Sequence, residues 1–229
     1  MNAPDTRQPF EAVGARYDAA QMLVVRDRTL DAVKAIAAAI APGMVEEDAV
    51  ELAKDILAER GMLRGWHGVF VRFGKNTIKS CSEASEPGVV LGDDDLFFID
   101  IGPTWKNLEG DGGDTFVTGT NADMARCAAD ARAIFHAVRQ RWLASGDSGK
   151  VLYEFARSET ERRGWTLNME LSGHRITDFP HAAAYNGTLA EIDFCPAPLL
   201  WVLEIHIRHP QQTYGAFFED LLLDDSYFA

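Results

Sequence analysis

Two runs in the middle of the chain carry its clearest pattern: Leu96-Phe97-Phe98-Ile99-Asp100-Ile101-Gly102, followed by Asp111-Gly112-Gly113-Asp114-Thr115-Phe116-Val117. The first run is apolar enough to form a buried strand, yet it carries Asp100 near its end. A buried carboxylate is costly unless it is paired or bound to a metal. The two runs predict antiparallel strands whose facing ends bring Asp100 and Asp111 together, with the segment from Gly102-Pro103 to Gly110 turning the chain. Two carboxylates that meet in this way repel each other unless cations lie between them.

Two glutamates further along the chain repeat this pattern. Glu204 lies in a strand-like run, 201–208, whose alternation places Glu204, His206 and Arg208 on one face and apolar residues on the other. Such a strand fits the wall of a site, and it also fits a solvated edge strand. Glu219 follows Phe217-Phe218, and a charged residue in so apolar a run is rarely buried without a partner.

Two histidines, His174 and His181, lie seven residues apart. One could be a metal ligand and the other a proton shuttle, or both could be ordinary loop histidines. Asp111 could likewise be an ordinary loop aspartate, because aspartate is frequent around it. Several carboxylates that converge with one histidine are typical of sites for hard or borderline divalent ions.

The remaining sequence predicts a single α+β domain over residues 16–229, preceded by a flexible arm over residues 1–15. Apolar spacing predicts helices over about 17–40, 46–60, 122–143 and 150–163. Strands are expected over about 69–73, 95–101, 114–118, 165–171, 201–208 and 216–223. Two helices followed by strands therefore occur twice, which suggests two similar halves without an obvious sequence repeat.

Composition excludes several classes of partner. The net charge of −13 argues against binding to nucleic acid, which requires a basic surface. No apolar run approaches the roughly 20 residues needed to span a bilayer. The cysteines, Cys81, Cys127 and Cys195, show no C-x-x-C spacing, and the start carries no basic and apolar signal sequence. These features predict free thiols in a cytoplasmic protein.

Taken together, the motifs resemble metallopeptidase family M24, the pita-bread fold of methionine aminopeptidases, aminopeptidase P, prolidase and creatinase. The resemblance runs from about Tyr17 to the C-terminus. The segments that match the family's ligand blocks are Ile99-Asp100-Ile101-Gly102, Asp111 to Val117, Gly173-His174 with His181, Leu203 to Arg208, and Phe217 to Asp220. The resemblance implies two pseudo-symmetric halves of antiparallel strands flanked by helices, and two divalent metal ions (Mn, Co, Fe or Zn).

The resemblance also implies a role for each candidate residue. Asp100 and Asp111 would bind one metal. The other would be bound by Asp111, His174, Glu204 and Glu219, with Asp111 and Glu219 bridging. A metal-bridging hydroxide would be the nucleophile, Glu204 would accept its proton, and His181 would polarise the substrate carbonyl or stabilise the oxyanion. The implied partners are a small peptide or peptide-like substrate and a second copy of the chain in a homodimer.

The substrate-binding positions depart from the family pattern. Relatives usually carry a histidine shortly after an S-G-x-N segment, whereas Phe73-Gly74-Lys75-Asn76 is followed here by Cys81-Ser82. His67 could take over the binding of substrate, or it could be structural. His206, which replaces a glycine, is expected to narrow or polarise the pocket. Arg175 and Thr177 are expected to place larger polar side chains at the site floor.

Three functions follow as alternatives. The leading hypothesis is a dinuclear metal-dependent hydrolase of the aminopeptidase-like, Xaa-Pro type. The same fold and metal site could instead act on a non-peptide C–N or C–S bond, because the missing histidine alters the substrate shell. A non-enzymatic binding module is the third alternative, and the retained set of five ligands argues against it.

Overall fold

The computed structural model of the protein describes residues 9–180 and 185–228. Its α-helices are α1 (Ala19–Ala39), α2 (Glu46–Glu59), α3 (Ala122–Ser145) and α4 (Gly149–Arg162). Its strands are β1 (Gly65–Phe73), β2 (Leu96–Trp105), β3 (Leu108–Glu109), β4 (Gly112–Val117), β5 (Thr166–Leu167), β6 (His174–Arg175), β7 (Trp201–Arg208) and β8 (Gly215–Leu221). The four predicted helices are confirmed to within a few residues at each end.

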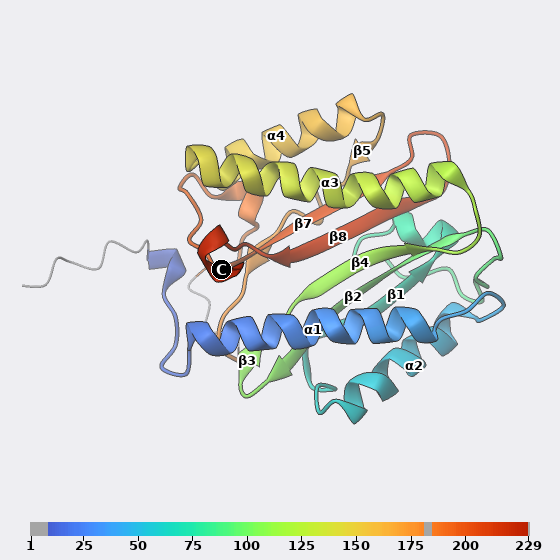
Figure 1. Ribbon diagram of the computed structural model, residues 1–229, viewed down its shortest axis with the longest axis horizontal. Coiled ribbons are helices and arrows are strands. Elements are labelled where there is room, and N and C mark those ends of the chain that lie inside the picture. The colour runs from blue at the N-terminus through green and yellow to red at the C-terminus, as the bar shows by residue number, and fades with distance from the viewer. Residues whose placement is uncertain (1–8, 181–184, 229) are drawn as a thin grey trace, which may run out of the picture.

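The strands form one antiparallel sheet in the order β1-β2-β4-β8-β7-β5, with β3 paired to β2 and β6 paired to β7. The contact of β4 with β8 joins a first half, built from the N-terminal strands, to a second half built from the C-terminal strands. Helices α1 and α2 lie along the first half, and α3 and α4 lie along the second (Figure 1). The predicted α+β architecture of two helix-flanked halves is confirmed.

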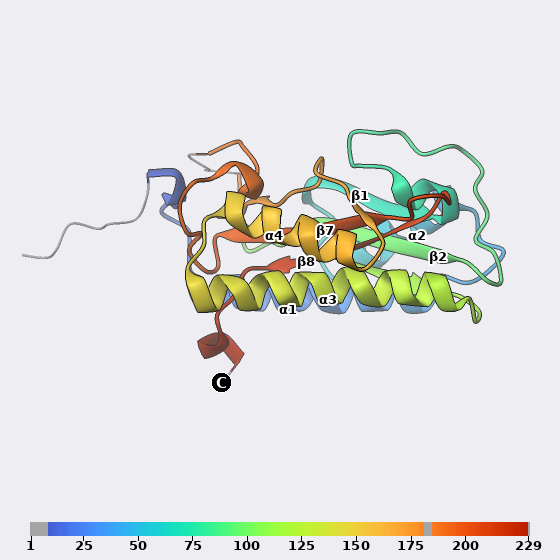
Figure 2. The same cartoon turned by 90° about the horizontal axis from the view of Figure 1, so that it is seen from above.

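Period-two alternation decides which face of the sheet the helices cover. Phe97, Ile99 and Ile101 of β2 belong to the core that contains α1 and α2. The apolar residues of β7, such as Leu203 and Ile205, belong to the core that contains α3 and α4. Helices α1 and α3 accordingly lie together on one side of the strands (Figure 2). The intervening residues of β2 and β7 therefore point to the opposite face.

Local capping explains where several helices begin and end. Asp18 accepts a hydrogen bond from the backbone N–H of Gln21 at the start of α1, and Ser148 accepts one from Val151 at the start of α4. Asn121 caps α3 in the same way. Helix α3 ends at Gly146, whose φ of 63° is the left-handed conformation that glycine adopts without steric cost.

The first hairpin differs from the prediction. Strand β2 continues through Gly102-Pro103 to Trp105, and the chain turns at Lys106 and Asn107, whose φ angles are 50° and 61°. Two consecutive residues with positive φ give the tight turn whose twist matches that of the flanking strands. Asp100 therefore lies in the middle of β2 rather than at its end, and the expectation of two facing strand ends was wrong. A second difference is that the strand expected over 165–171 is limited to β5.

The described part of the predicted N-terminal arm, residues 9–15, makes buried contacts. The Glu11 side chain accepts hydrogen bonds from the backbone N–H of Ala197 and the indole of Trp201. The guanidinium of Arg175 donates to the carbonyls of Phe10 and Ala12. Within residues 9–180 and 185–228, no helix has the length and apolar character needed to cross a membrane.

Candidate metal centre

A row of acidic side chains crosses the open face of the sheet. The register pairs Asp100 with Gly113, Gly113 with Glu219, and Glu219 with Glu204. Directly paired residues of antiparallel strands project to the same face. Asp100, Glu219 and Glu204 therefore converge from β2, β8 and β7, and all three are buried. A larger residue would not fit at Gly113, because a Cβ there would lie 2.5 Å from the Phe217 ring.

Asp111 and His174 complete the cluster from its margins. Asp111 lies one residue before β4, and His174 lies on β6, which pairs with β7. The distance from His174 Nε2 to Asp111 Oδ2 is 2.9 Å, and that to Glu204 Oε1 is 3.8 Å. His174 Nδ1 lies 2.9 Å from the carbonyl of Arg175, which can only accept a hydrogen bond. Nδ1 therefore carries the proton, and Nε2 faces the carboxylates.

Burial of so many carboxylates perturbs their ionisation. Burial raises the pKa of Asp100 to about 7, although the charge of His67 opposes the shift. Burial also raises the pKa of Glu204 against the charge of His174, and it raises that of Glu219 together with the charges of Asp111 and Asp100. Burial opposes the charged forms of Asp111 and His174. The charge of His67 and the contact with His174 nevertheless lower the pKa of Asp111, and the contact with Asp111 raises that of His174 to about 10.

The donor set fits divalent cations. Two groups of three donors, each with its atoms within 4.8 Å of one another, share Asp111: His67, Asp100 and Asp111, and Asp111, His174 and Glu219. Glu219 Oε1 is buried without a hydrogen-bond partner among the described residues. Oxygen donors mixed with imidazole suit Mn, Fe, Co or Zn. Two such cations would compensate the buried negative charge that the histidines balance only in part.

A cavity of about 320 Å³ opens directly onto this cluster. Polar groups of the cluster form one part of its lining, and apolar and aromatic side chains form the rest. The lining residues are Trp66, His67, Phe70, Cys81, Ser82, Asp100, Leu171, His174 and Glu204. Its volume and its few convergent polar groups are typical of a small-molecule site.

The structure brings together all five residues predicted from the sequence as metal ligands, and it places His67 beside them. It places His206 elsewhere. His206 is fully buried, with Nε2 2.7 Å from the Thr77 carbonyl and Nδ1 3.0 Å from Asn168 Nδ2, and it does not line the described cavity. Burial lowers the pKa of His206 to about 4. His181 lies outside the described residues.

Arg175 also differs from the expectation of a polar site floor. It neighbours His174 on β6, so its side chain points to the other side of the strand. There its guanidinium donates to the carbonyls of Phe10, Ala12 and Leu200. Arg175 therefore anchors the N-terminal segment, and it is absent from the described lining of the cavity.

Sequence reasoning missed the aromatic wall of the site. The Trp66 ring stands edge-on to His67 and to His174, with centroid separations of 4.6 and 5.0 Å, and its Nε1 donates to the carbonyl of Gly110. Phe70 of β1 pairs with Asp100 of β2, so its aromatic side chain lies on the same face of the sheet, beside the end of the acidic row. The signal available in the sequence was Gly65-Trp66-His67-Gly68, in which two bulky rings lie between two glycines.

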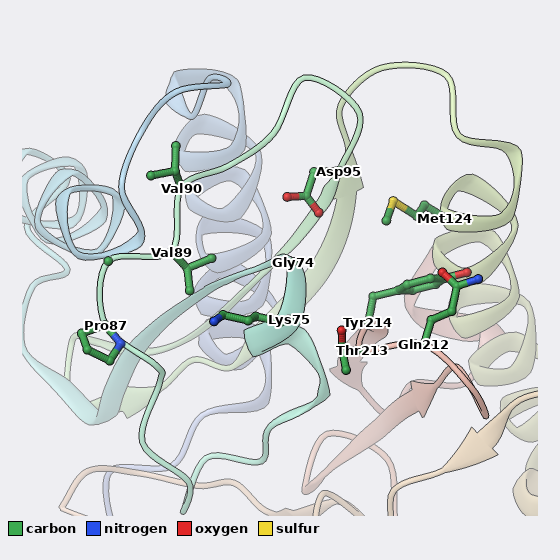
Figure 3. Close-up of a pocket in the computed structure, with 11 residues that line it drawn as sticks. Gly74, Lys75, Pro87, Val89, Val90, Asp95, Met124, Gln212, Thr213 and Tyr214 are labelled. Carbon is green, nitrogen blue, oxygen red and sulfur yellow. The ribbon is translucent and has the colours of Figure 1, made fainter.

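A larger cavity, of about 470 Å³, lies away from the cluster. It lies between Gly74 and Lys75, which follow β1, and residues 212–214, which precede β8. Figure 3 shows Lys75 and Asp95 from one side of it, with Met124 and Tyr214 from the other. The Asp95 carboxylate already accepts hydrogen bonds from the backbone N–H groups of Gly92 and Leu96. This cavity lacks a convergent set of titratable donors among its described lining residues, so the smaller cavity is the candidate active site.

Comparisons with known proteins agree with this fold. The model of metallopeptidase family M24 matches residues 20–223. A comparison with curated proteins found no significant match. Among solved structures, the chain is similar to an X-Pro aminopeptidase from Thermotoga maritima, at 20% identity and a TM-score of 0.67, over 89% of this chain and 57% of that one.

Two further solved structures give the same result. A prolidase from Pyrococcus furiosus matches at 18% identity and a TM-score of 0.69, over 90% of this chain and 60% of that one. Proline aminopeptidase P II from Yersinia pestis matches at 17% identity and a TM-score of 0.66, over 91% and 55% of the two chains. The chain spans less than two thirds of the length of these proteins. At such identities the similarity establishes the fold, which is the predicted pita-bread fold.

Proposed function

The chain belongs to metallopeptidase family M24, and on that premise we propose that it is a dinuclear metal-dependent hydrolase of the aminopeptidase-like, Xaa-Pro type. The observation that carries this proposal is the cross-strand register, which aligns Asp100, Glu219 and Glu204 on one open face of the sheet. Asp111 and His174 close the same cluster. A buried row of acids would be unstable unless cations or protons compensated its charge.

The residues that would hold the two ions are Asp100, Asp111, His174, Glu204 and Glu219. When bound, the ions would supply an activated water at neutral pH and polarise the scissile carbonyl. Asp111 is suited to bridging because its two carboxylate oxygens face different imidazoles: Oδ1 lies 3.1 Å from His67 Nε2, and Oδ2 lies 2.9 Å from His174 Nε2.

Glu204 is the proposed proton acceptor of the reaction. Its Oε2 accepts a hydrogen bond of 2.6 Å from the backbone N–H of Gly173, which fixes the carboxylate, while Oε1 faces His174. A carboxylate fixed in this way beside the ions could take up a proton during turnover and return it to the leaving amine. His181 is proposed from the sequence alone as the group that polarises the carbonyl or stabilises the oxyanion.

A small peptide or peptide-like molecule is the proposed substrate. The similar X-Pro aminopeptidase and prolidase folds support this class. The cavity fits a short substrate: Trp66, Phe70 and Leu171 offer apolar contact beside the acidic groups. Its limited volume favours one or two residues of a peptide over a folded protein chain.

One observation favours a second candidate function, which is cleavage of a non-peptide C–N or C–S bond. Cys81 and Ser82 line the cavity on the loop where relatives usually carry a substrate-binding histidine. A thiol and a hydroxyl hydrogen-bond more weakly to a peptide carbonyl than an imidazolium does. The same metal site could therefore serve a substrate that lacks a peptide bond.

The test is metal analysis of the purified protein combined with cleavage assays on Xaa-Pro and Met-led peptides in added Mn or Co. We expect about two metals per chain and cleavage of Xaa-Pro peptides. The Glu204→Gln variant should lose cleavage, whereas Glu86→Gln, which changes an exposed acid paired with Lys75, should behave as wild type. Metal binding without cleavage of any peptide would favour the non-peptide reaction. Absence of bound metal would contradict the proposal.

A further inference from the structure

We propose that His67 is itself a metal ligand, so that each of the two ions in the site receives one imidazole. This inference rests on the metal site proposed above and adds a ligand that the resemblance to family M24 did not supply. It is carried by the position of the His67 ring, by the strand irregularity that puts the ring there, and by the tautomer that its neighbours impose.

The position of His67 Nε2 fits a coordination shell. It lies 3.1 Å from Asp111 Oδ1 and 3.6 Å from Asp100 Oδ1. Ligand atoms held about 2.0–2.2 Å from one ion at angles near 90–110° lie roughly 3–3.5 Å apart. His174 Nε2 stands in a matching relation to the other half of the cluster, 2.9 Å from Asp111 Oδ2. Asp111 thus lies between two imidazoles, with one oxygen toward each.

An irregularity in β1 aims the ring at the site. In the pairing of β1 with β2, Gly65 faces Pro103 and Val69 faces Ile101, so four steps along β1 correspond to two along β2. The extra residues bulge out of the strand and carry Trp66 and His67 over the acidic row. Bulges next to active sites commonly redirect a side chain in this way.

Gly102 provides the space that the ring occupies. A Cβ on Gly102 would lie 2.0 Å from His67 Cδ2 and 2.2 Å from Nε2. Any side chain at this position would therefore displace the imidazole. The edge of Trp66 packs against the same ring and against His174, which fixes both imidazoles relative to each other.

The tautomer of His67 also suits a ligand. Nδ1 lies 2.7 Å from the carbonyl of Gly68, which can only accept, so Nδ1 carries the proton. Nε2 then faces Asp100 and Asp111. A lone pair facing two carboxylates is repulsive unless Nε2 holds a proton or a cation, so a metal ion would take the place of that proton. Metal-ligating histidines usually donate their other N–H to a carbonyl in this way.

A second imidazole has a consequence for metal selection. Imidazole suits Zn, Co and Fe better than it suits Mg or Ca, which prefer oxygen alone. With His67 on one ion and His174 on the other, both positions would favour Zn, Co or Fe over Mg or Ca.

The experiment is proton NMR of the protein loaded with two equivalents of Co²⁺, together with calorimetric titration of the metal-free protein with Co²⁺. Both histidines donate Nδ1–H to a backbone carbonyl, so each coordinated ring should give one strongly shifted, solvent-exchangeable N–H resonance. We expect His67→Ala to lose one of these resonances and to weaken one of the two Co²⁺ affinities by about tenfold or more. His136→Ala, an exposed change on α3, is the matched control and should alter neither.

A second variant tests the same inference with the imidazole retained. Gly102→Ala should displace the His67 ring and reproduce both effects of His67→Ala. If His67→Ala keeps the full set of shifted resonances and both Co²⁺ affinities, His67 is not a ligand, and lost peptide cleavage in that variant would identify it as a substrate-binding residue. If the wild-type protein binds no Co²⁺, the metal site itself fails, and the proposed function fails with it.

Discussion

At the scale of single residues, the site depends on side chains whose ionisation is set by burial. Asp111 touches two imidazoles at once, and His206, two positions from Glu204 on the same strand, is held neutral by its surroundings. Glu204 and His206 therefore show how one strand face can carry both a reactive group and a structural one. Asp111 and His206 each lead to a distinct prediction.

The first prediction concerns Asp111→Asn. The substitution preserves size but removes the charge that both halves of the metal site share, so we expect metal content to fall from about two ions per chain and peptide cleavage to drop at least about 100-fold. Metal analysis and initial rates on one Xaa-Pro peptide measure both. Asp55→Asn, an exposed change on α2, is the control. Retention of two ions by Asp111→Asn would contradict the bridging role.

The second prediction concerns pH and His206. Its Nε2–H donates to Thr77 and its Nδ1 accepts from Asn168, so the neutral ring satisfies both contacts. Because burial lowers its pKa to about 4, the unfolded chain binds the proton more tightly between pH 6.5 and 4. This group therefore lowers the free energy of unfolding as pH falls through that window, by on the order of 3 kcal/mol in all.

Urea unfolding at pH 7 and at pH 4.5 measures this effect. In His206→Gln, which does not titrate, the loss of stability between the two pH values should be smaller than in the wild type. An equal loss in both proteins would show that His206 does not contribute to the pH dependence. Asn168 and Thr77 can still bond to the glutamine amide, so the variant should fold at pH 7.

At the scale of elements, the loop after β1 is held to the sheet by one buried arginine. The guanidinium of Arg72, in β1, donates to the hydroxyl of Ser85 and to the carbonyls of Ser80 and Glu83. The same loop carries Cys81 and Ser82 into the cavity. Arg72 thus helps to position the part of the loop that faces the cavity.

The third prediction is that Arg72→Met loosens this loop. Three charge-assisted hydrogen bonds are lost, so we expect a decrease in stability of about 2 kcal/mol or more and faster labelling of Cys81 by a thiol reagent. Cys195 is an internal control, since its labelling rate should not change. Cys127 should stay unlabelled at pH 8 because burial raises its pKa to about 12. Unchanged labelling of Cys81 would show that Arg72 does not hold the loop.

At the scale of the whole molecule, the candidate metal site lies at the seam between the two halves of the sheet. Asp100 comes from the first half and Glu204 and Glu219 come from the second, while β4 and β8 are paired at Gly113 and Glu219 alone. Ions bound at this seam would stabilise the folded chain, because the unfolded chain has no preformed site. The expected homodimer and cytoplasmic location remain predictions from the sequence.

The fourth prediction is that a chelator lowers the thermal stability of the whole chain. With free metal at about 100 times its Kd, the metal contributes about 2.7 kcal/mol, which corresponds to roughly 5–10 °C in Tm for a chain of this size. Calorimetry with and without chelator measures the shift. Glu219→Gln should start at lower metal content and respond less. If the chelator does not change the Tm of the wild-type protein, no bound ion stabilises the contact between the two halves.

The helices and the α+β class follow from the sequence, which also predicted the five acidic and imidazole side chains that the structure brings together. Those features depend on local spacing: apolar periodicity fixes a helix face, and a carboxylate such as Asp100 inside an apolar strand is too costly to bury without a partner. The placement of Asp100 at a strand end was wrong, because β2 passes through Gly102-Pro103 and turns only where Lys106 and Asn107 adopt positive φ.

Which polar residues reach the site depends on tertiary contacts between distant segments. His206 shares its strand face with Glu204, yet it lies one row away, where Phe98 and Phe217 enclose it. His67 reaches the acids because β1 bulges and Gly102 leaves space for its ring, two facts that belong to strand pairing across distant segments. Period-two alternation in the sequence predicts which face of a strand a side chain lies on. The residues that it contacts depend on strand register and on bulges, and these are set by pairing across the whole sheet.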